Sequence, residues 1–245
     1  MNLNKGIVMI MLLTTACNTA TEQNVAEEQK SLQKELGAKK QKWMDGASEE
    51  KVALYERGIQ EIRDEGILTS AIHEGQIAPD FELKNDRGEW ISLEDKLEKG
   101  PVILTWYRGG WCPYCNMTLA ALQDNLPEIT ALGGSVLALS PELQDSVEST
   151  ANENSIEFEM LSDVANQVAH SYGLVFTLIP EIADGMNEKF KAYNGDESHE
   201  LPVPATYVID QQGVVRYAFL DPDYRTRAEP SDLIEVLRMI KSEEE

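Results

Sequence analysis

Two cysteines separated by two residues, Cys112 and Cys115, are the side chains of this sequence best suited to chemistry. A thiol reacts as its thiolate, and the ordinary cysteine pKa of about 8.5 falls at helix N-termini and beside cations. Cys112 precedes a predicted helix, and Arg108 lies four residues before it. We therefore predict that Cys112 is a nucleophile and that Cys115, one helical turn later, attacks its oxidised or mixed-disulfide form.

Two alternatives for a lone cysteine pair are a structural disulfide and half of a zinc site. A disulfide that closes so short a loop removes little entropy from the unfolded chain. Zinc needs two further ligands, and the three histidines, His73, His170 and His199, show no paired spacing. Redox chemistry without a metal or cofactor is therefore favoured over both alternatives.

The elements around the motif predict how it is positioned. Residues 101–107 form a nearly continuous apolar and β-branched run, typical of a strand buried on both faces. Apolar residues recur at intervals of three and four after Cys115, which predicts a helix. Further strands and helices alternate downstream, where Ser140 and Asp163 are predicted helix caps, and this alternation is typical of an α/β fold.

The N-terminal segment resembles an export signal. Lys5 precedes an apolar run at 7–13 that is too short to span a bilayer. Thr14-Thr15-Ala16-Cys17 resembles a bacterial lipobox, in which the cysteine receives lipid and becomes the new N-terminus. Cleavage nearby as an ordinary secretory signal is the alternative. Under both interpretations the protein is exported. We predict a protein of the bacterial cell envelope that is anchored by lipid on Cys17 and faces the periplasm.

The predicted organisation has four parts. Residues 1–17 are the signal peptide, 18–71 a polar tether with two amphipathic helices, 72–240 the main domain and 241–245 an acidic tail. The two helices are interpreted as a packing appendage, with a partner-binding arm as the alternative. With 43 Asp and Glu against 21 Lys and Arg, the formal charge is −22, which argues against nucleic acid and anionic membrane surfaces as partners.

Several motifs together resemble the peroxiredoxins of the alkyl hydroperoxide reductase/thiol-specific antioxidant superfamily, near its bacterioferritin comigratory protein branch. They are Ala78-Pro79-Asp80-Phe81-Glu82-Leu83, Trp111-Cys112-Pro113-Tyr114-Cys115 and Pro204-Ala205-Thr206-Tyr207-Val208-Ile209-Asp210. The resemblance covers about residues 72–240 and implies a thioredoxin fold, a central mixed sheet flanked by helices. It also implies a thioredoxin-dependent peroxidase, an antioxidant oxidoreductase that reduces hydrogen peroxide or organic hydroperoxides and is reduced again by thioredoxin or a similar dithiol.

The resemblance assigns roles to residues of the motif. Cys112 forms a sulfenic acid, Cys115 resolves it as a disulfide, and Arg108 stabilises the thiolate. Three further residues are expected to contact substrate: Gly110, Trp111 and Pro204. No metal site is implied, and no particular oligomeric state is predicted.

The sequence also departs from the peroxiredoxin pattern. Typical members place a proline seven residues and a threonine three residues before the catalytic cysteine, where this chain has Thr105 and Gly109. Their distant arginine precedes the strand near Thr206, where this chain has Pro204. A proline at that place in thioredoxin-like thiol-disulfide oxidoreductases is cis and pairs with a substrate polypeptide, so a cis Val203–Pro204 bond is expected, with a trans bond as the alternative.

Two alternative functions stay open beside the peroxidase. The first is an exported thioredoxin-like oxidoreductase acting on protein disulfides, with the same nucleophile. The second is a non-catalytic envelope interaction module that uses the N-terminal helices. The segment 173–200 has no clear periodicity, and we interpret it as an inert insertion, with a lid over Cys112 as the alternative.

Overall fold

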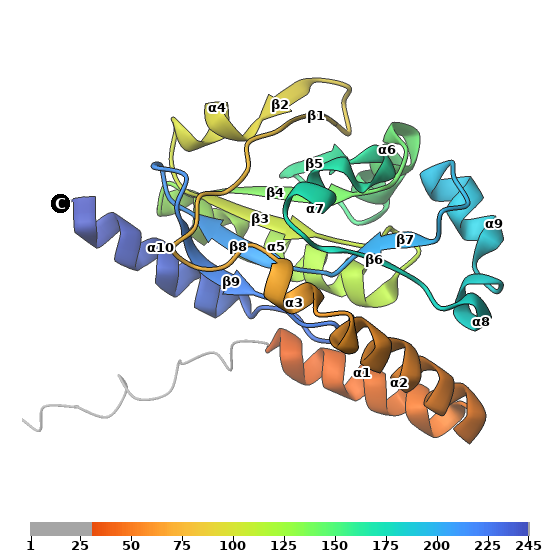
Figure 1. Ribbon diagram of the computed structural model, residues 1–245. Coiled ribbons are helices and arrows are strands. Elements are labelled where there is room, and N and C mark those ends of the chain that lie inside the picture. The colour runs from red at the N-terminus through yellow and green to blue at the C-terminus, as the bar shows by residue number, and fades with distance from the viewer. Residues whose placement is uncertain (1–30, 245) are drawn as a thin grey trace, which may run out of the picture. The chain divides into compact units, whose positions relative to one another are not determined.

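The apolar run at 101–107 forms an inner strand of a seven-stranded mixed sheet. The computed structural model, which describes residues 31–244, shows this sheet between helices (Figure 1). The strand order is β2 (Trp90–Ser92), β1 (Glu82–Asn85), β5 (Glu159–Ser162), β4 (Ser135–Ser140), β3 (Val102–Trp106), β8 (Thr206–Ile209) and β9 (Val215–Phe219). β3, β4 and β5 run parallel, while β8 and β1 run antiparallel to their neighbours. The predicted α/β architecture is confirmed.

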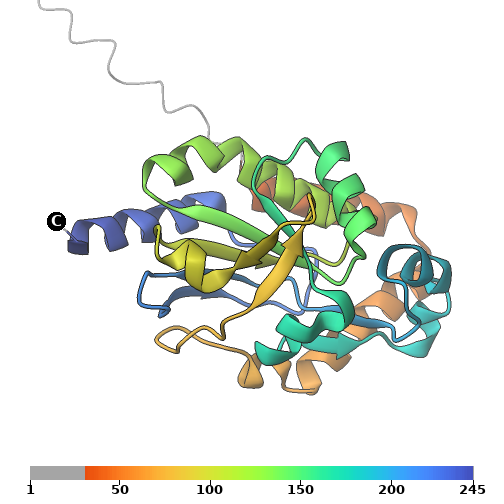
Figure 2. The same cartoon turned by 90° about the horizontal axis from the view of Figure 1, so that it is seen from above.

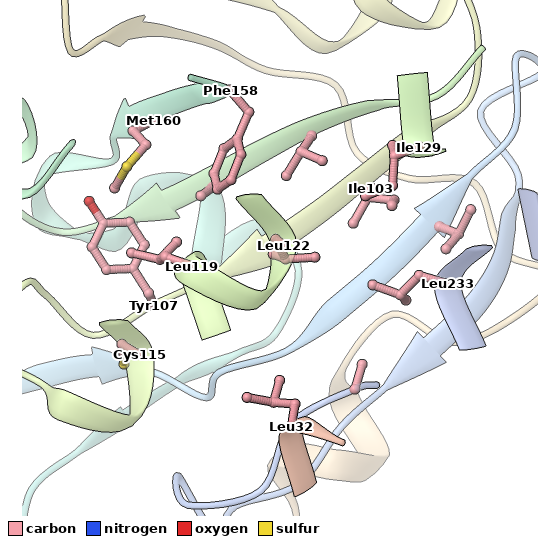
Figure 3. Packing of buried hydrophobic residues seen from close by; sticks show 14 of the residues in the cluster. Leu32, Ile103, Tyr107, Cys115, Leu119, Leu122, Ile129, Phe158, Met160 and Leu233 are labelled. Atoms are coloured by element: carbon pink, nitrogen blue, oxygen red, sulfur yellow. The ribbon is translucent and has the colours of Figure 1, made fainter. Parts of the chain in front are cut away.

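Helices cover both faces of the sheet: α5 (Pro113–Ala131) and α10 (Pro230–Glu244) on one, α4 (Leu93–Leu97) and α7 (Gln167–Ser171) on the other. Ile103 of β3 packs with α5 and α10, whereas Val102 and Leu104 pack against the opposite layer. Figure 3 shows Ile103 in the first cluster, with Leu122 and Ile129 of α5. Burial on both faces explains why β3 is apolar apart from Thr105.

The two predicted N-terminal helices are present as α1 (Leu32–Gly46) and α2 (Glu49–Asp64), followed by the short α3 (Ile67–Ser70). Ser31 and Ser48 cap the first two, because each hydroxyl accepts a hydrogen bond from the backbone N–H three residues later. Leu32 and Leu36 are buried in the same cluster as α5. The N-terminal helices therefore contribute to the core that supports the cysteine motif.

The segment 173–200 folds into a small second sheet and short helical turns. These elements are β6 (Val175–Thr177), α8 (Pro180–Ala183), α9 (Asn187–Lys189), a π-helical turn (Phe190–Asn194) and β7 (Glu200–Pro202). β6 and β7 pair antiparallel. Phe176 and Phe190 form a third hydrophobic cluster with Ile62 of α2. Figure 2 shows α8 and α9 at the end of the domain where α2 also lies, and α2 contacts α8.

Two predicted helix caps behave differently in the structure. The prediction that Ser140 caps a helix is wrong, because Ser140 ends β4 and α6 (Gln144–Glu153) begins four residues later with Leu143 at its cap. The Asp163 carboxylate does accept hydrogen bonds from the N–H groups of Val168 and Ala169 at 2.9 and 3.0 Å, in the first turn of α7. A 3₁₀ turn (Val164–Asn166) lies between Asp163 and α7, so Asp163 caps the helix without being the residue directly before it.

The predicted signal peptide, lipobox and tether at 1–30 lie outside the described residues. Within residues 31–244, no helix is long and apolar enough to cross a membrane. The same part of the chain contains no group of three or more His, Cys, Asp or Glu side chains that could hold a metal ion.

Candidate active site

Cys112 occupies the N-cap of α5, at the point where the buried strand gives way to the helix. Its carbonyl accepts a hydrogen bond from the N–H of Asn116 at 3.1 Å, and Pro113 begins the helix with a fixed φ and no N–H to leave unpaired. The unpaired N–H groups of a helix N-terminus favour negative charge. The predicted strand-to-helix position of the motif is confirmed, and both cysteines are free thiols with no solvent-exposed surface.

Two glycines make the turn before Cys112 possible. Gly109 has φ +140°, and a Cβ there would lie 2.4 Å from the indole nitrogen of Trp111. A Cβ on Gly110 would lie 2.2 Å from the hydroxyl of Thr150. The N–H of Gly110 donates to the buried Glu142 carboxylate at 2.9 Å, which fixes the turn to the connection that follows β4. A side chain at either position would displace the loop.

Arg108 is the cation nearest the nucleophile. Its Nη2 donates to the sulfur of Cys112 at 3.4 Å, and its backbone N–H points to the sulfur of Cys115 at 3.5 Å. The guanidinium lies 3.8 Å from the ring centroid of Tyr224, which holds it against the cysteine. Its Nε has no hydrogen-bond partner in the described structure, although the residue is only 7% exposed. One buried N–H group of Arg108 is therefore left unpaired by the described part of the protein.

A second buried arginine, Arg227, contacts the other cysteine and was missed by sequence reasoning. Its Nη2 lies 3.4 Å from the sulfur of Cys115, and its Nη1 donates to the carbonyl oxygens of Tyr224 and Thr226. Within residues 31–244, neither Arg108 nor Arg227 forms an ion pair with a carboxylate. Two buried positive charges are therefore directed at two sulfur atoms.

The environment shifts the pKa values of the two thiols in opposite directions. Burial by itself raises the pKa of Cys112, but a hydrogen bond from Cys115 and the charges of Arg108 and Arg227 lower it well below its ordinary value. Burial, together with the hydrogen bond to Cys112 and the charge on that thiolate, raises the pKa of Cys115. Cys112 is thus the thiolate and Cys115 the thiol of the resting pair.

The loop that carries Tyr224 and Arg227 is attached to the N-terminal helices. Asp223 accepts hydrogen bonds from Arg225 Nε at 2.6 Å and from Lys40 of α1 at 2.9 Å. Arg225, whose side chain is fully buried, also pairs with Glu56 of α2 at 2.7 Å. Burial alone would raise the pKa of Asp223, but these hydrogen bonds and charges lower it to about 2. In the sequence, the only feature that could have pointed to this loop is the pair Arg225 and Arg227, close together in an acidic chain.

The other predicted site residues are placed as follows. Trp111 stacks near Arg108, with the guanidinium 5.2 Å from its ring centroid. Both backbone polar groups of Gly110 are used within the protein, because its carbonyl accepts from Asn116 at 2.8 Å. Pro204 is buried just before β8, and the Val203–Pro204 bond is trans, so the expectation of a cis bond is wrong. The Thr105 hydroxyl pairs with that of Thr206 at 2.8 Å across β3 and β8 and does not contact the cysteines.

A pocket of about 320 Å³ opens beside the motif. Arg108, Trp111 and Pro113 line its redox side together with Tyr114 and Tyr224, and residues of α1, α2 and the segment 176–189 line the rest. The segment interpreted as an insertion therefore contributes directly to the surroundings of the cysteines. Neither cysteine lines the pocket, so the guanidinium of Arg108 lies between it and the sulfur of Cys112.

Comparisons with known proteins identify the family of the chain. The model of the AhpC/TSA family matches residues 75–218. The chain is 28% identical over 154 residues to peroxiredoxin Q, chloroplastic, of Triticum aestivum, a match that covers 63% of this chain and 62% of that protein. It is 27% identical over 148 residues to peroxiredoxin Bcp of Escherichia coli, covering 60% of this chain and 85% of that protein.

Solved structures support the same fold. The crystal structure of peroxidoxin BcpB from Mycobacterium tuberculosis superimposes with a TM-score of 0.56 at 21% identity, covering 69% of this chain and 98% of that one. This likeness confirms the predicted thioredoxin fold. Residues 31–74, which form α1 to α3, and the Arg225 loop both lie outside the part matched by the family model.

Proposed function

Because this chain belongs to the AhpC/TSA family, we propose that it is a thiol-dependent peroxidase that reduces hydrogen peroxide or organic hydroperoxides. The observation that carries the proposal is the contact between the Cys112 sulfur and the Arg108 guanidinium at 3.4 Å. That guanidinium stabilises the thiolate and can donate hydrogen bonds to the reacting oxygen atoms. It supplies what the missing threonine and the missing distant arginine supply in typical family members.

In the first step the Cys112 thiolate attacks one oxygen of the peroxide. The S–O bond forms and the O–O bond breaks, and the electron pair of that bond leaves on the second oxygen. This oxygen takes a proton and departs as water or an alcohol. Cys112 becomes a sulfenic acid, oxidised by two electrons, while the peroxide is reduced by two. Hydrogen bonds from a fixed, buried guanidinium stabilise the charge that develops on the leaving oxygen.

In the second step Cys115 attacks the sulfur of the Cys112 sulfenic acid. The S–S bond forms, the S–O bond breaks and water leaves after taking a proton. The thiolate charge that raises the pKa of Cys115 disappears when Cys112 is oxidised, whereas Arg227 stays at 3.4 Å. The pKa of Cys115 therefore falls only after the first step. Oxidation of Cys112 thus makes Cys115 easier to ionise and therefore a better nucleophile.

In the third step a dithiol reduces the Cys112–Cys115 disulfide, for which thioredoxin or a similar protein is the proposed reductant. The attacking thiolate bonds to one sulfur, and the other leaves as a thiolate. If the attack falls on Cys112, the leaving sulfur is Cys115, which Arg227 stabilises. The alternative, a protein-disulfide oxidoreductase, uses the same nucleophile and is distinguished by its substrate.

We also propose that the protein is exported and anchored to the cell envelope through lipid on Cys17, facing the periplasm. The support is the signal-like run at 7–13 and the Thr14-Thr15-Ala16-Cys17 sequence. Mass spectrometry of the mature N-terminus tests this, because a lipidated cysteine adds a defined mass. Cys17→Ser should release the protein from the membrane fraction, and a membrane-bound variant with unmodified residue 17 would contradict the proposal.

The peroxidase is tested by stopped-flow fluorescence of Trp111, which lies next to Cys112 in the chain. Reduced protein mixed with hydrogen peroxide should show a fast, concentration-dependent change that Cys112→Ser abolishes. If the site does not position the peroxide, Cys112 should be oxidised no faster than a free thiolate. That outcome, together with rapid exchange with a protein disulfide, would favour the oxidoreductase instead.

A further inference from the structure

Glu142 is a buried carboxylate that the proposed mechanism does not use. It has no exposed surface and lies in the connection from β4 to α6. Among residues 31–244, no Lys, Arg or His side chain forms an ion pair with it. A buried charge without a cation costs free energy unless hydrogen bonds replace the lost water. The donors of those hydrogen bonds therefore show what Glu142 is attached to.

The shortest of these hydrogen bonds comes from the turn at 108–112, which carries both Arg108 and Cys112. The N–H of Gly110 donates to a carboxylate oxygen of Glu142 at 2.9 Å. Burial raises the pKa of Glu142, and the hydrogen bond from Gly110 is the largest of the contacts that oppose this rise. Glu142 is thus bound to the residue that lies midway in the chain between Arg108 and Cys112.

Thr150 of α6 completes the contact with Gly110. Its hydroxyl lies 3.3 Å from each carboxylate oxygen of Glu142. A Cβ on Gly110 would lie 2.2 Å from this same hydroxyl, so the turn packs directly on Thr150. α6 itself packs beside β5 (Figure 1). Glu142 and Thr150 therefore form one support under Gly110.

The support is fixed to the sheet through the backbone of Glu142. Its N–H donates to the hydroxyl of Ser140 at the end of β4 at 3.3 Å, and its carbonyl accepts from the hydroxyl of Ser162 at the end of β5 at 2.6 Å. On the other side of the turn, the carbonyl of Gly110 accepts from Asn116 of α5 at 2.8 Å. The turn is therefore held between the strand ends and α5.

We propose that Glu142 is a positioning residue for the first oxidation step: its carboxylate holds the Gly110 turn and so keeps the Arg108 guanidinium against the Cys112 sulfur. The inference rests on the proposed peroxidase function and names a residue outside the motif on which its first step depends. Glu142 acts through Gly110 and not through contact with the peroxide. Without an acceptor the N–H of Gly110 is left unpaired, the turn moves to recover that cost, and the 3.4 Å contact between Arg108 and Cys112 lengthens.

Position and charge predict opposite effects on the pKa of Cys112. A negative charge at Glu142 disfavours a thiolate nearby, so removing the charge alone should lower the pKa of Cys112. Loss of the Arg108 contact should raise that pKa, because the charge and the hydrogen bond of Arg108 lower it in the intact site. The direction of the change therefore distinguishes a positioning role from a purely electrostatic one.

The test measures the thiolate and the peroxide reaction separately. The full chain carries Cys17→Ser so that Cys112 and Cys115 are its only thiols. The pH midpoint of thiolate formation is followed by ultraviolet absorbance, with Cys112→Ser as the blank, and oxidation by hydrogen peroxide is followed by tryptophan fluorescence. Glu142→Leu should raise the midpoint by about one pH unit and slow oxidation at pH 7 about tenfold.

The conservative variant should restore the site. In Glu142→Gln the amide oxygen can accept from Gly110 and the amide nitrogen can donate to Thr150, so the turn keeps its support although the charge is lost. Most of the oxidation rate should therefore return, with a midpoint no higher than that of the parent chain.

Asp163 provides a matched control. It is also a buried carboxylate directly after a strand, but its oxygens accept from N–H groups of α7 at 2.9 and 3.0 Å instead of from the turn. Asp163→Leu should lose stability in urea as Glu142→Leu does and leave the midpoint unchanged. Thr150→Val covers the case in which Glu142→Leu does not fold. It removes only a hydroxyl and should change the midpoint and the rate in the same direction, by about threefold in rate.

The outcomes separate this inference from the function on which it rests. If Glu142→Leu and Thr150→Val lose stability but keep the parent midpoint and rate, Glu142 has a structural role only and the proposal is overturned. A midpoint that falls in Glu142→Leu, or a Glu142→Gln variant as slow as Glu142→Leu, overturns it as well, because charge and not the hydrogen bond would then control Cys112. If the midpoints change as expected but the parent reacts with hydrogen peroxide no faster than a free thiolate, the peroxidase proposal alone fails.

Discussion

The two cysteines lie one helical turn apart, yet their cationic partners come from very different parts of the chain. Arg108 is four residues before Cys112 and belongs to the same strand-to-helix connection. Arg227 is 112 residues after Cys115 and belongs to a loop held by α1 and α2. The first contact joins two residues of one short connection, although Tyr224 of the loop that carries Arg227 also packs on the Arg108 guanidinium. The second requires the N-terminal helices to be in place.

The reactivity of Cys112 and that of Cys115 should therefore depend on different parts of the fold. The Arg108 side should govern the attack of Cys112 on peroxide, because it touches the nucleophile and the pocket. The Arg227 side should govern the chemistry of Cys115. Residues far from the sulfur atoms, in α1 and α2, should then affect the second half more than the first.

The largest expected effect comes from the cysteines themselves. Cys112→Ser should abolish peroxide consumption, since a serine hydroxyl is not ionised near neutral pH and cannot form a sulfenic acid. Cys115→Ser should leave the first oxidation intact and stop turnover with a dithiol protein at the sulfenic acid. Mass spectrometry after one equivalent of peroxide separates the two, because a sulfenic acid adds one oxygen and a disulfide removes two hydrogens. Equal loss of the first step in both variants would contradict the assigned order.

The next effect tests the attachment of the Arg227 loop. Asp223→Asn removes the charge that pairs with the buried Arg225 and with Lys40, so about 3 kcal/mol of stability should be lost. The pKa of Asp223 in the folded protein, about 2, is below its unfolded value of about 3.9. Its contribution is therefore complete above pH 4 and disappears as the pH falls towards 2. Urea unfolding at pH 7 and pH 3 should show a smaller difference between parent and variant at the lower pH.

The arginines themselves should give effects of about 10- to 100-fold on single steps. Arg108→Gln removes the charge and hydrogen bond that lower the pKa of Cys112, so oxidation by hydrogen peroxide slows at pH 7 and recovers as the pH rises. Arg227→Gln should slow disulfide formation more than it slows the first oxidation. Stopped-flow traces that resolve both phases measure this. If the two variants change the same phase equally, the proposed division between Arg108 and Arg227 is wrong.

Sequence reasoning found the parts of the site that depend on local structure. The buried strand, the helix start and the position of Cys112 follow from apolar spacing and from the motif, and Arg108 is near enough in the chain to be recognised. Arg227 follows β9 outside any motif, and its contact with Cys115 depends on where the whole domain places that loop. The pocket was missed for the same reason, because α2 and the segment 176–189 meet only in the folded chain.

The predictions that failed also concern non-local structure. Ser140 has the sequence signature of a helix cap, but pairing with β5 extends β4 through it, so the helix begins later. Pro204 was expected in cis by resemblance to other thioredoxin-like proteins, and its bond is trans. Sheet pairing and backbone isomer are decided by partners distant in the chain, which a local pattern does not contain.

The smallest effect should come from Glu56 of α2, the second carboxylate that pairs with Arg225. Glu56 pairs with Arg225 at 2.7 Å, but its side chain is 43% exposed, so Glu56→Gln should cost about 1 kcal/mol or less and should lose its effect in 1 M salt. Glu61→Gln, an exposed change on the same helix, is the control. Because Asp223 still holds Arg225, disulfide formation should slow less than in Asp223→Asn. A Glu56 variant that slows it as strongly would mean that α2, and not Asp223, is the element that keeps Arg227 at Cys115.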